Sequence, residues 1–296
     1  MTASVLINCY NQEPYIAECL DSVLAQSQSA DEVIAVNDGS TDGSRGIIES
    51  YCRKHAAIHL IDQKNGGQLS AIETAVLAAK GDVCFLLDAD DTWKTDHIAR
   101  VMAVYKARDD IDFVYTAYEC FDGCADVARE YTSDHDHGMT VLVTLAGVAN
   151  IGSLTSGISC RAHFLQAGFP VTDEKLRAAY RICADDYVQK ATSVAGARKF
   201  YLNTPTANYR IHGHNNFAGH KRSRQEKFRN ELRAAMALNY LRRHFLLEDL
   251  AVLDPSREFL TIPRPGRKER RRCVKAISRL KTRGAPVFLT AAYWRA

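Results

Sequence analysis

Three carboxylates stand directly after a short apolar run in the first third of the chain. The run Val83-Cys84-Phe85-Leu86-Leu87 is followed by Asp88-Ala89-Asp90-Asp91. Five consecutive apolar residues indicate a strand buried on both faces, as in a mostly parallel sheet. Carboxylates this close repel one another unless a cation joins them, and a divalent metal that carries phosphates prefers such oxygen ligands. The alternative is a solvated turn whose acids lie at the N-terminus of the next helix, where the helix dipole favours negative charge.

Two later groups could take part in the same chemistry. The pair Asp185-Asp186 supplies two more carboxylates, and His212 follows an expected strand at 207–211. A carboxylate within hydrogen-bond reach of a hydroxyl can take its proton, and neutral imidazole is a common metal ligand. The alternative for His212 is a structural histidine bonded within the fold.

A third group of this kind lies in the middle of the chain. The segment Ser133-Asp134-His135-Asp136-His137 alternates acids and imidazoles, which could bind a metal. It lies inside the polar and acidic stretch 119–138, which we interpret as a mobile loop.

Strands and helices alternate four times in the first 115 residues. Strands are expected at 4–9, 32–36, 58–61, 83–87 and 112–115, with helices between them. Short connections of this kind predict a parallel sheet covered on both faces. Each of the first four strands is followed by a polar cluster, namely Tyr10-Asn11, Asp38-Gly39-Ser40, Asn65-Gly66-Gly67 and Asp88-Ala89-Asp90. Because such strand ends meet at one sheet edge, the clusters predict one ligand-binding cleft.

Composition is ordinary for a soluble globular protein. The chain has 296 residues, of which 46% are hydrophobic and 25% charged. It lacks a secretory signal pattern, and no apolar stretch approaches the ~18 residues of a membrane span. Nine cysteines without paired-ligand spacing favour reduced thiols and a cytoplasmic location. No Gly-x-Gly-x-x-Gly or Walker lysine loop is present.

The end of the chain differs from the rest in charge. A long amphipathic helix is expected at 225–247, followed by a segment, 264–283, that carries ten Lys or Arg residues and one acid, Glu269, for a net charge of +9. The remainder, with 28 basic and 34 acidic residues, carries −6. The basic segment could contact an anionic membrane from the cytoplasmic side, or be a solvated end or an oligomer contact. Nucleic-acid binding is not expected, because no recognition module is present.

Six motifs occur in the order and spacing of family 2 glycosyltransferases, which the sequence resembles over about residues 3–216. They are Val5-Leu6-Ile7-Asn8-Cys9-Tyr10-Asn11, Asn37-Asp38-Gly39-Ser40-Thr41-Asp42, Asn65-Gly66-Gly67-Gln68, Leu87-Asp88-Ala89-Asp90-Asp91, Asp185-Asp186 and Tyr209-Arg210-Ile211-His212. The resemblance implies a GT-A fold, a nucleotide-sugar donor (UDP-linked in most such enzymes), a divalent metal (Mn²⁺ or Mg²⁺) and inversion at the anomeric carbon. The acceptor would be a glycan or lipid-linked hydroxyl, as in the assembly of bacterial surface polysaccharides.

The resemblance also implies a role for each motif residue. Asp38 would accept a hydrogen bond from the base and Asp88 would bind the ribose. Asp186 would be the general base with Asp185 as its orienting partner, although the two could exchange roles. The remaining nucleotide-binding residues would be Cys9, Tyr10, Asn11, Gly67, Gln68 and Ala89, and the metal set would be Asp90, Asp91 and His212.

The implied organisation has a catalytic domain at 1–216 and a helical extension at 217–296. The domain would consist of a nucleotide-binding half (1–115) and an acceptor half (116–216).

Two alternatives for the function stay open. Asp88-Ala89-Asp90-Asp91-Thr92 also resembles the nucleophile motif of haloacid dehalogenase-type phosphatases, in which Asp88 would be a covalent nucleophile. A catalytically silent nucleotide-sugar binding protein is the other.

Overall fold

A single mixed sheet forms the centre of the fold, in the strand order β3-β2-β1-β4-β9-β6-β10-β5. The structure is a computed structural model that describes residues 1–123, 126–213, 223–247 and 255–280. The strands β1 (Ala3–Cys9), β2 (Glu32–Asp38), β3 (Ile58–Gln63) and β4 (Val83–Asp88) pair in parallel. This arrangement confirms the predicted α/β class. The sheet is Rossmann-like, and the strand pairs that share the most residues are parallel.

Helices cover both faces of the sheet because successive strand residues point to opposite sides. Val5 and Ile7 of β1 pack into one apolar core, with α1 (Ile16–Leu24), α2 (Ser44–Lys54) and α4 (His97–Ala107). Leu6 points into the other core, with α3 (Gln68–Ala78), α6 (Ala162–Gln166) and α8 (Ala184–Val194). Strands buried on both faces account for the continuous apolar runs in the sequence.

The second half of the sheet has a topology that strand patterns did not predict. β9 (Ile158–Arg161) lies antiparallel between β4 and β6 (Phe113–Phe121). β10 (Lys199–Arg210) runs parallel to β6, and its end pairs with the two-residue strand β5 (Thr92–Trp93). The strand expected at 207–211 is therefore the end of a longer strand that begins at Lys199 and ends at Arg210. Its carboxyl end returns to the sheet edge at which Asp88, Asp90 and Asp91 lie.

The segment interpreted as a mobile loop contains regular structure, so that interpretation is wrong for its second part. β7 (Val127–Ala128) pairs with β6, and β8 (His135–Gly138) pairs antiparallel with β10. His137 is 3% exposed, and its Nε2 lies 2.7 Å from the hydroxyl of Tyr115. The imidazole of His137 thus finds a hydrogen-bond partner inside the fold. The short helix α5 (Val141–Leu145) and a 3₁₀ turn (Thr155–Gly157) lead from β8 to β9.

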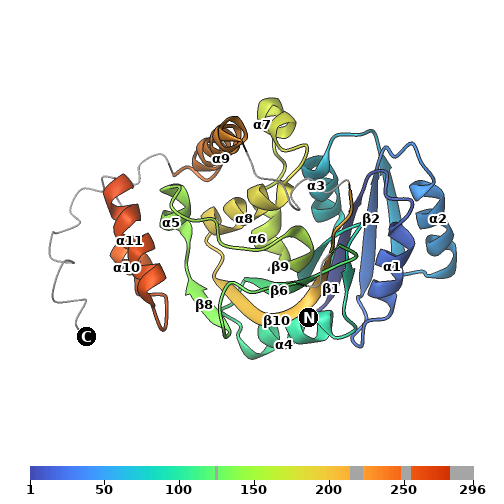
Figure 1. The fold of residues 1–296 in the computed structure, drawn as a ribbon, viewed down its shortest axis with the longest axis horizontal. Coiled ribbons are helices and arrows are strands. Elements are labelled where there is room, and N and C mark those ends of the chain that lie inside the picture. Colours follow the sequence, from blue (N-terminus) through green and yellow to red (C-terminus); the bar gives the residue numbers. More distant parts are fainter. Residues whose placement is uncertain (124–125, 214–222, 248–254, 281–296) are drawn as a thin grey trace.

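The C-terminal helices pack against the rest of the fold. Figure 1 shows α10 (Pro255–Phe259) and α11 (Arg267–Leu280) at the end of the molecule opposite α1 and α2. The predicted long helix is α9 (Arg224–His244), next to α7 (Glu174–Ala179). α9 buries Ala237, Leu238 and Leu241 near its end, whereas Phe228 and Leu232 near its start are exposed.

The basic segment is largely helical and docked. α11 buries Glu269, Cys273 and Ala276. This excludes a fully solvated end for 267–280, while 281–283 lie outside the described residues. In the described part of the chain, none of the helices combines the length and hydropathy required to cross a bilayer.

Candidate active site

One cleft at the carboxyl edge of the parallel strands collects the predicted residues. Asp90 and Asp186, which are far apart in the sequence, both line it. Two separated acidic groups therefore face the same space, as the combined metal-site and base predictions require. The other predicted residues on its wall are Cys9, Tyr10, Asn11, Asp38, Gly67, Gln68, Asp88, Ala89, Asp185 and His212. Asp91 is the predicted residue that is not part of the wall.

Asp90 and His212 form the polar centre of the cleft. Nε2 of His212 lies 3.1 Å from Oδ2 of Asp90, and the His212 ring stacks on Tyr15 with centroids 5.0 Å apart. β10 makes this contact possible because its end runs beside β5. One ligand atom from each of Asp88, Asp90 and Asp91 lies within 4.8 Å of the others.

Asp91, unlike Asp88 and Asp90, has its carboxylate buried inside the fold rather than at the cleft wall. Its side chain is almost fully buried, and it accepts hydrogen bonds from Ser156 Oγ at 2.5 Å and from the backbone N–H of Arg210 at 2.9 Å. Arg210 also donates from Nε to the carbonyl of Asp90 at 2.8 Å. Asp91 and Arg210 therefore tie the end of β10 to the acidic turn, and the role of Asp91 as a metal ligand stays a prediction.

The acidic cluster is electrostatically unfavourable by itself. Burial, and next the charge of Asp90, raise the pKa of Asp88 to about 7. Burial and the same neighbour raise the pKa of Asp91 well above its ordinary value. Raised pKa values mean that the folded chain disfavours these negative charges, and a divalent cation would offset the repulsion. The oxygen-rich set with one imidazole suits a hard or borderline cation, so the residues fit the predicted metal.

Gln68 connects the acidic turn with the second acidic pair. Its Nε2 donates to Oδ1 of Asp88 at 2.9 Å, and its Oε1 accepts from the backbone N–H of Ala184 at 2.9 Å. The preceding Gly67 has φ +88°, and a Cβ there would lie 2.6 Å from Cα of Arg181. Any residue other than glycine at position 67 would therefore push the turn before α3 away from the segment that contains Arg181.

The pair Asp185-Asp186 lies in the first turn of α8. Asp186 accepts from Asn150 Nδ2 at 3.0 Å and from the Tyr180 hydroxyl at 2.6 Å, and it pairs with Lys190 one turn later. Burial, and next the charge of Asp186, raise the pKa of Asp185 to about 6. Asp186 is therefore firmly oriented, whereas Asp185 is the desolvated member of the pair.

Three of the predicted nucleotide residues, Tyr10, Asn11 and Asp38, also line the cleft. Tyr10 is half-exposed, and Asn11 adopts φ 53° with its Oδ1 accepting from the Thr41 N–H at 2.8 Å. Asp38 accepts from the backbone N–H groups of Gly66 and Gly67, both at 2.8 Å. Asp38 thus holds the glycine turn in place, and its contact with a base remains a prediction.

Sequence analysis missed several residues that shape the site. Asn8 donates to Oδ1 of Asp88 at 2.7 Å, and Gln12 lies 3.5 Å from Oδ2 of Asp90. Tyr180 and Lys190 hold Asp186 as described above. Asn8 and Arg210 stand inside motifs that were recognised, but a motif does not show which way a side chain points. Lys190 follows Asp186 by four residues, the spacing of an i,i+4 helix pair, so that signal was available.

Comparison with known proteins agrees with this arrangement. Residues 4–158 match the family described as Glycosyl transferase family 2. An uncharacterized glycosyltransferase of Nostoc sp. is 34% identical over 73% of this chain and 66% of its own length. A putative teichuronic acid biosynthesis glycosyltransferase, TuaG of Bacillus subtilis, is 35% identical over 39% of this chain and 46% of its own. The chain thus spans less than two thirds of these relatives.

Solved structures share the fold. S. aureus TarS in complex with UDP-GlcNAc superposes with a TM-score of 0.61 at 18% identity, covering 94% of this chain and 80% of that one. The mannosyltransferase PcManGT from Pyrobaculum calidifontis, in complex with GDP-Man and Mn²⁺, gives a TM-score of 0.50 at 16% identity, covering 94% and 86%. The fold is thus that of GT-A glycosyltransferases. With residues 4–158 matching the family and its acidic strand-end motifs gathered at one cleft, the chain belongs to glycosyl transferase family 2.

Proposed function

We propose that this protein is an inverting, metal-dependent glycosyltransferase that moves a sugar from a UDP-linked donor to an acceptor hydroxyl. The observation that carries the proposal is that Asp90 with His212, and Asp185 with Asp186, open onto one cleft. An inverting displacement needs charge neutralisation on the leaving side of the anomeric carbon and a base on the opposite side. In this proposal the first group supplies the charge neutralisation and the second supplies the base.

Asp90 and His212 would hold the metal, with Asp88 close enough to contribute. A bound divalent ion neutralises the charge that builds on the departing diphosphate, without a protonated acid. Asp91 serves as a positioning residue, because its carboxylate is engaged by Ser156 and Arg210. Mn²⁺ or Mg²⁺ is proposed, and the Mn²⁺ in the PcManGT complex supports the first.

Asp186 is the proposed base. It takes the proton of the acceptor hydroxyl while that oxygen forms a bond to the anomeric carbon, and the bond from that carbon to the diphosphate oxygen breaks. Contacts with Asn150 and Tyr180 hold its carboxylate at the cleft wall, which is the orientation a base needs. Asp185 is the second candidate, because its pKa of about 6 lies close to neutrality.

The donor pocket is assigned to the side of the cleft formed by Tyr10, Asn11 and Asp38. Tyr10 offers an exposed ring on which a base can stack. The TarS complex with UDP-GlcNAc supports a uridine nucleotide. The acceptor is proposed to be a glycan or a lipid-linked sugar in surface polysaccharide assembly, which the name of TuaG supports.

Peripheral membrane contact from the cytoplasmic side is part of the proposal. Arg267, Arg271 and Lys275 follow one another at four-residue spacing along α11, and all three are exposed. They form a basic stripe on the face opposite the buried Glu269, Cys273 and Ala276. Such a stripe is attracted to anionic lipid, where a lipid-linked acceptor would be found.

The two alternatives differ from this proposal in what they require. The phosphatase motif normally lies on the first strand, whereas Asp88 ends β4 and the chain belongs to another family. A silent binding protein would bind the donor without turnover. Incubating the full chain with UDP-sugars, acceptor glycans and Mn²⁺, and measuring UDP release and glycan product, separates the cases. Transfer supports the proposal, and donor binding without transfer or hydrolysis overturns it.

A further inference from the structure

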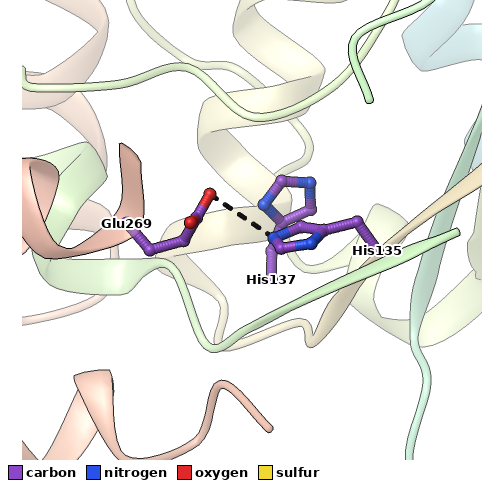
Figure 2. Close-up of side chains that lie close together, drawn as sticks. All are labelled: His135, His137 and Glu269. Atoms are coloured by element: carbon purple, nitrogen blue, oxygen red, sulfur yellow. Dashed lines mark ion pairs between the residues drawn. The ribbon is translucent and has the colours of Figure 1, made fainter. Parts of the chain in front are cut away.

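A second group of metal-ligating side chains lies away from the catalytic cleft. His135 and His137 come from β8, and Glu269 comes from α11. One ligand atom from each lies within 4.8 Å of the others. Figure 2 shows the three side chains converging between the strand and the helix. His137 and Glu269 also line a small cavity that shares no lining residue with the catalytic cleft, so this cluster is a separate feature.

Local geometry explains why the three side chains meet. His135 and His137 are two residues apart on a strand, which places them on the same face. Glu269 lies in the first turn of α11, on the face that the helix buries. His137 is 3% exposed and Glu269 is 5% exposed. A carboxylate removed from water in this way needs compensating charge or hydrogen bonds.

The distance between His135 and Glu269 suits two ligands of one ion. Nε2 of His135 lies 3.4 Å from Oε1 of Glu269, and within the described chain this buried nitrogen makes no hydrogen bond. An ordinary N–H···O bond is shorter, about 2.7–3.2 Å. Two ligands on a tetrahedral zinc ion with bonds of about 2.1 Å are about 3.4 Å apart.

Surrounding groups orient the ligands as they do in metal sites. The Tyr115 hydroxyl donates to Oε2 of Glu130 at 2.7 Å, so it accepts from Nε2 of His137, also at 2.7 Å. That tautomer leaves the lone pair of His137 on Nδ1. The Tyr131 hydroxyl donates to Oε1 of Glu269 at 3.0 Å, and its ring stacks on His135. Hydrogen bonds from outside the ligand set are a regular feature of metal sites.

Nearby cations are engaged elsewhere. Lys268 Nζ lies 2.6 Å from Oε1 of Glu130, and Nη2 of Arg272 lies 3.5 Å from the same oxygen. Lys268 and Arg272 of α11 thus pair with Glu130, and Arg272, which also lines the small cavity, reaches the Tyr131 hydroxyl at 3.5 Å. Among the described residues, the ion pair of Glu269 is therefore with His135 rather than with Lys268 or Arg272.

We propose that His135, His137 and Glu269 bind one Zn²⁺ ion that fastens α11 to β8. Two imidazoles and one carboxylate are a common ligand set for zinc and a poor one for Mg²⁺ or Ca²⁺, which prefer oxygen. Water completes the coordination from the side of the cavity. Because the ligands come from distant parts of the chain, the ion binds the folded state and stabilises the docking of the C-terminal extension.

The test uses the full chain carrying Asp90→Ala, which removes a ligand of the catalytic metal, after treatment with a chelator. Zn²⁺ is titrated by calorimetry, Tm is recorded with and without Zn²⁺, and Co²⁺ is added in a parallel sample. We expect one equivalent of Zn²⁺ to bind, a rise in Tm, and the intense visible absorption of four-coordinate Co²⁺. Absence of stoichiometric binding, or a Co²⁺ spectrum of the weak octahedral type, overturns the proposal.

Variants then assign the site. Glu269→Gln keeps one oxygen that can accept from the Gly266 N–H, so the helix start is retained, and its amide nitrogen can donate to the Tyr131 hydroxyl in place of the bond that Oε1 accepts. Glu269→Gln and His135→Gln are each expected to weaken Zn²⁺ binding by at least about tenfold. The exposed pair Glu174→Gln and His163→Gln, far from the cluster in sequence, serve as matched controls. Unchanged Zn²⁺ affinity in folded Glu269→Gln or His135→Gln contradicts the assignment.

Discussion

Gln68 donates a hydrogen bond to Asp88 with its side-chain nitrogen, 2.9 Å from Oδ1, while its side-chain oxygen accepts from the backbone of Ala184. One amide thus joins the end of β4 to the start of α8. The acidic turn proposed to hold the metal and the acidic pair proposed to supply the base are therefore held at a fixed separation. An inverting transfer depends on that separation, because the sugar must reach both groups at once.

Replacing Gln68 by Met is expected to reduce catalysis without unfolding the chain. Methionine fills a similar volume but makes neither hydrogen bond, and each lost bond costs about 1 kcal/mol, more where a buried partner is left unpaired. We expect kcat/KM to fall by about 10- to 100-fold, with Tm lowered by a few degrees and the chain still folded. Gln166→Met, which removes an amide that contacts Val76 and Ala79 instead, is the control. Equal activity of the two variants would contradict the bridging role.

Asp90→Ala is expected to abolish the metal-dependent part of UDP binding. Asp90 is the acid that faces the cleft beside His212, and its loss removes a ligand that alanine cannot replace. Thermal shifts with UDP, with and without Mn²⁺, measure the effect, since a ligand that binds the folded state raises Tm. The exposed Asp109→Ala serves as the control. A full Mn²⁺-dependent UDP shift in Asp90→Ala would remove Asp90 from the metal site.

The two members of the acidic pair are expected to respond differently to amide substitution. Asp186→Asn should lower kcat by about 10²- to 10⁴-fold, the usual contribution of a general base, and Asp185→Asn should lower it less. Burial raises the pKa of Asp185 to about 6, so kcat/KM should rise with pH through about 6, and this inflection should be absent in Asp185→Asn. The larger loss in Asp185→Asn would move the base to that residue.

Asp88→Asn is expected to change how stability depends on pH in the absence of metal. The folded-state pKa of Asp88 is raised to about 7, above the ordinary value of an aspartate. The wild-type chain therefore loses stability as pH rises from about 4 to about 7, because the Asp88 carboxyl group gives up its proton at a higher pH in the folded state than in the unfolded state. Asparagine has no such loss, so the difference in Tm between variant and wild type should grow from pH 5 to pH 8.

That measurement is made in a chelator, with Asp109→Asn as a surface control. Added Mn²⁺ should reduce the difference, since a bound cation compensates the charge of Asp88 in the wild type. Parallel Tm curves of Asp88→Asn and wild type across this pH range would show that Asp88 is not electrostatically strained.

The basic stripe on α11 is expected to bind anionic membranes. The triple variant Arg267→Glu, Arg271→Glu and Lys275→Glu reverses three exposed charges, each worth about 1 kcal/mol near an anionic surface. Flotation with vesicles that contain anionic lipid should recover the wild type and lose the variant, with less recovery as salt increases. Replacing the same three residues by Gln should give intermediate recovery. Equal flotation of all three proteins would contradict membrane contact through α11.

Much of the first half of the fold could be predicted from local patterns. Strands such as Val83–Leu87 are buried on both faces and read as continuous apolar runs, and helices such as α4 show 3.6-residue spacing. The polar residues after each strand lie at one sheet edge because parallel strands place their carboxyl ends together. Asp38, Asp88 and Asp90 therefore lie in the cleft that their positions predicted.

The second half was less predictable because its order depends on long-range pairing. β9 enters antiparallel between β4 and β6, which no strand pattern specifies. The stretch at 133–138 is polar and resembled a loop, yet β8 is held there by pairing with β10, and His137 is satisfied by Tyr115. The sequence left membrane contact, a solvated end and an oligomer contact open for the basic segment, whereas Glu269, Cys273 and Ala276 of its helix share one buried face.

The amino-acid sequence by itself determined the family, the alternation of strands and helices, and which acids stand at strand ends. These properties follow from residue type and short-range spacing, which are local. Only the tertiary structure decided how each polar group is used. It directs Asp91 toward Ser156 and Arg210 rather than the cleft, and it brings His212 to Asp90 and Glu269 to His135. Such contacts join residues far apart in the chain, so they depend on how the elements pack, which local spacing does not encode.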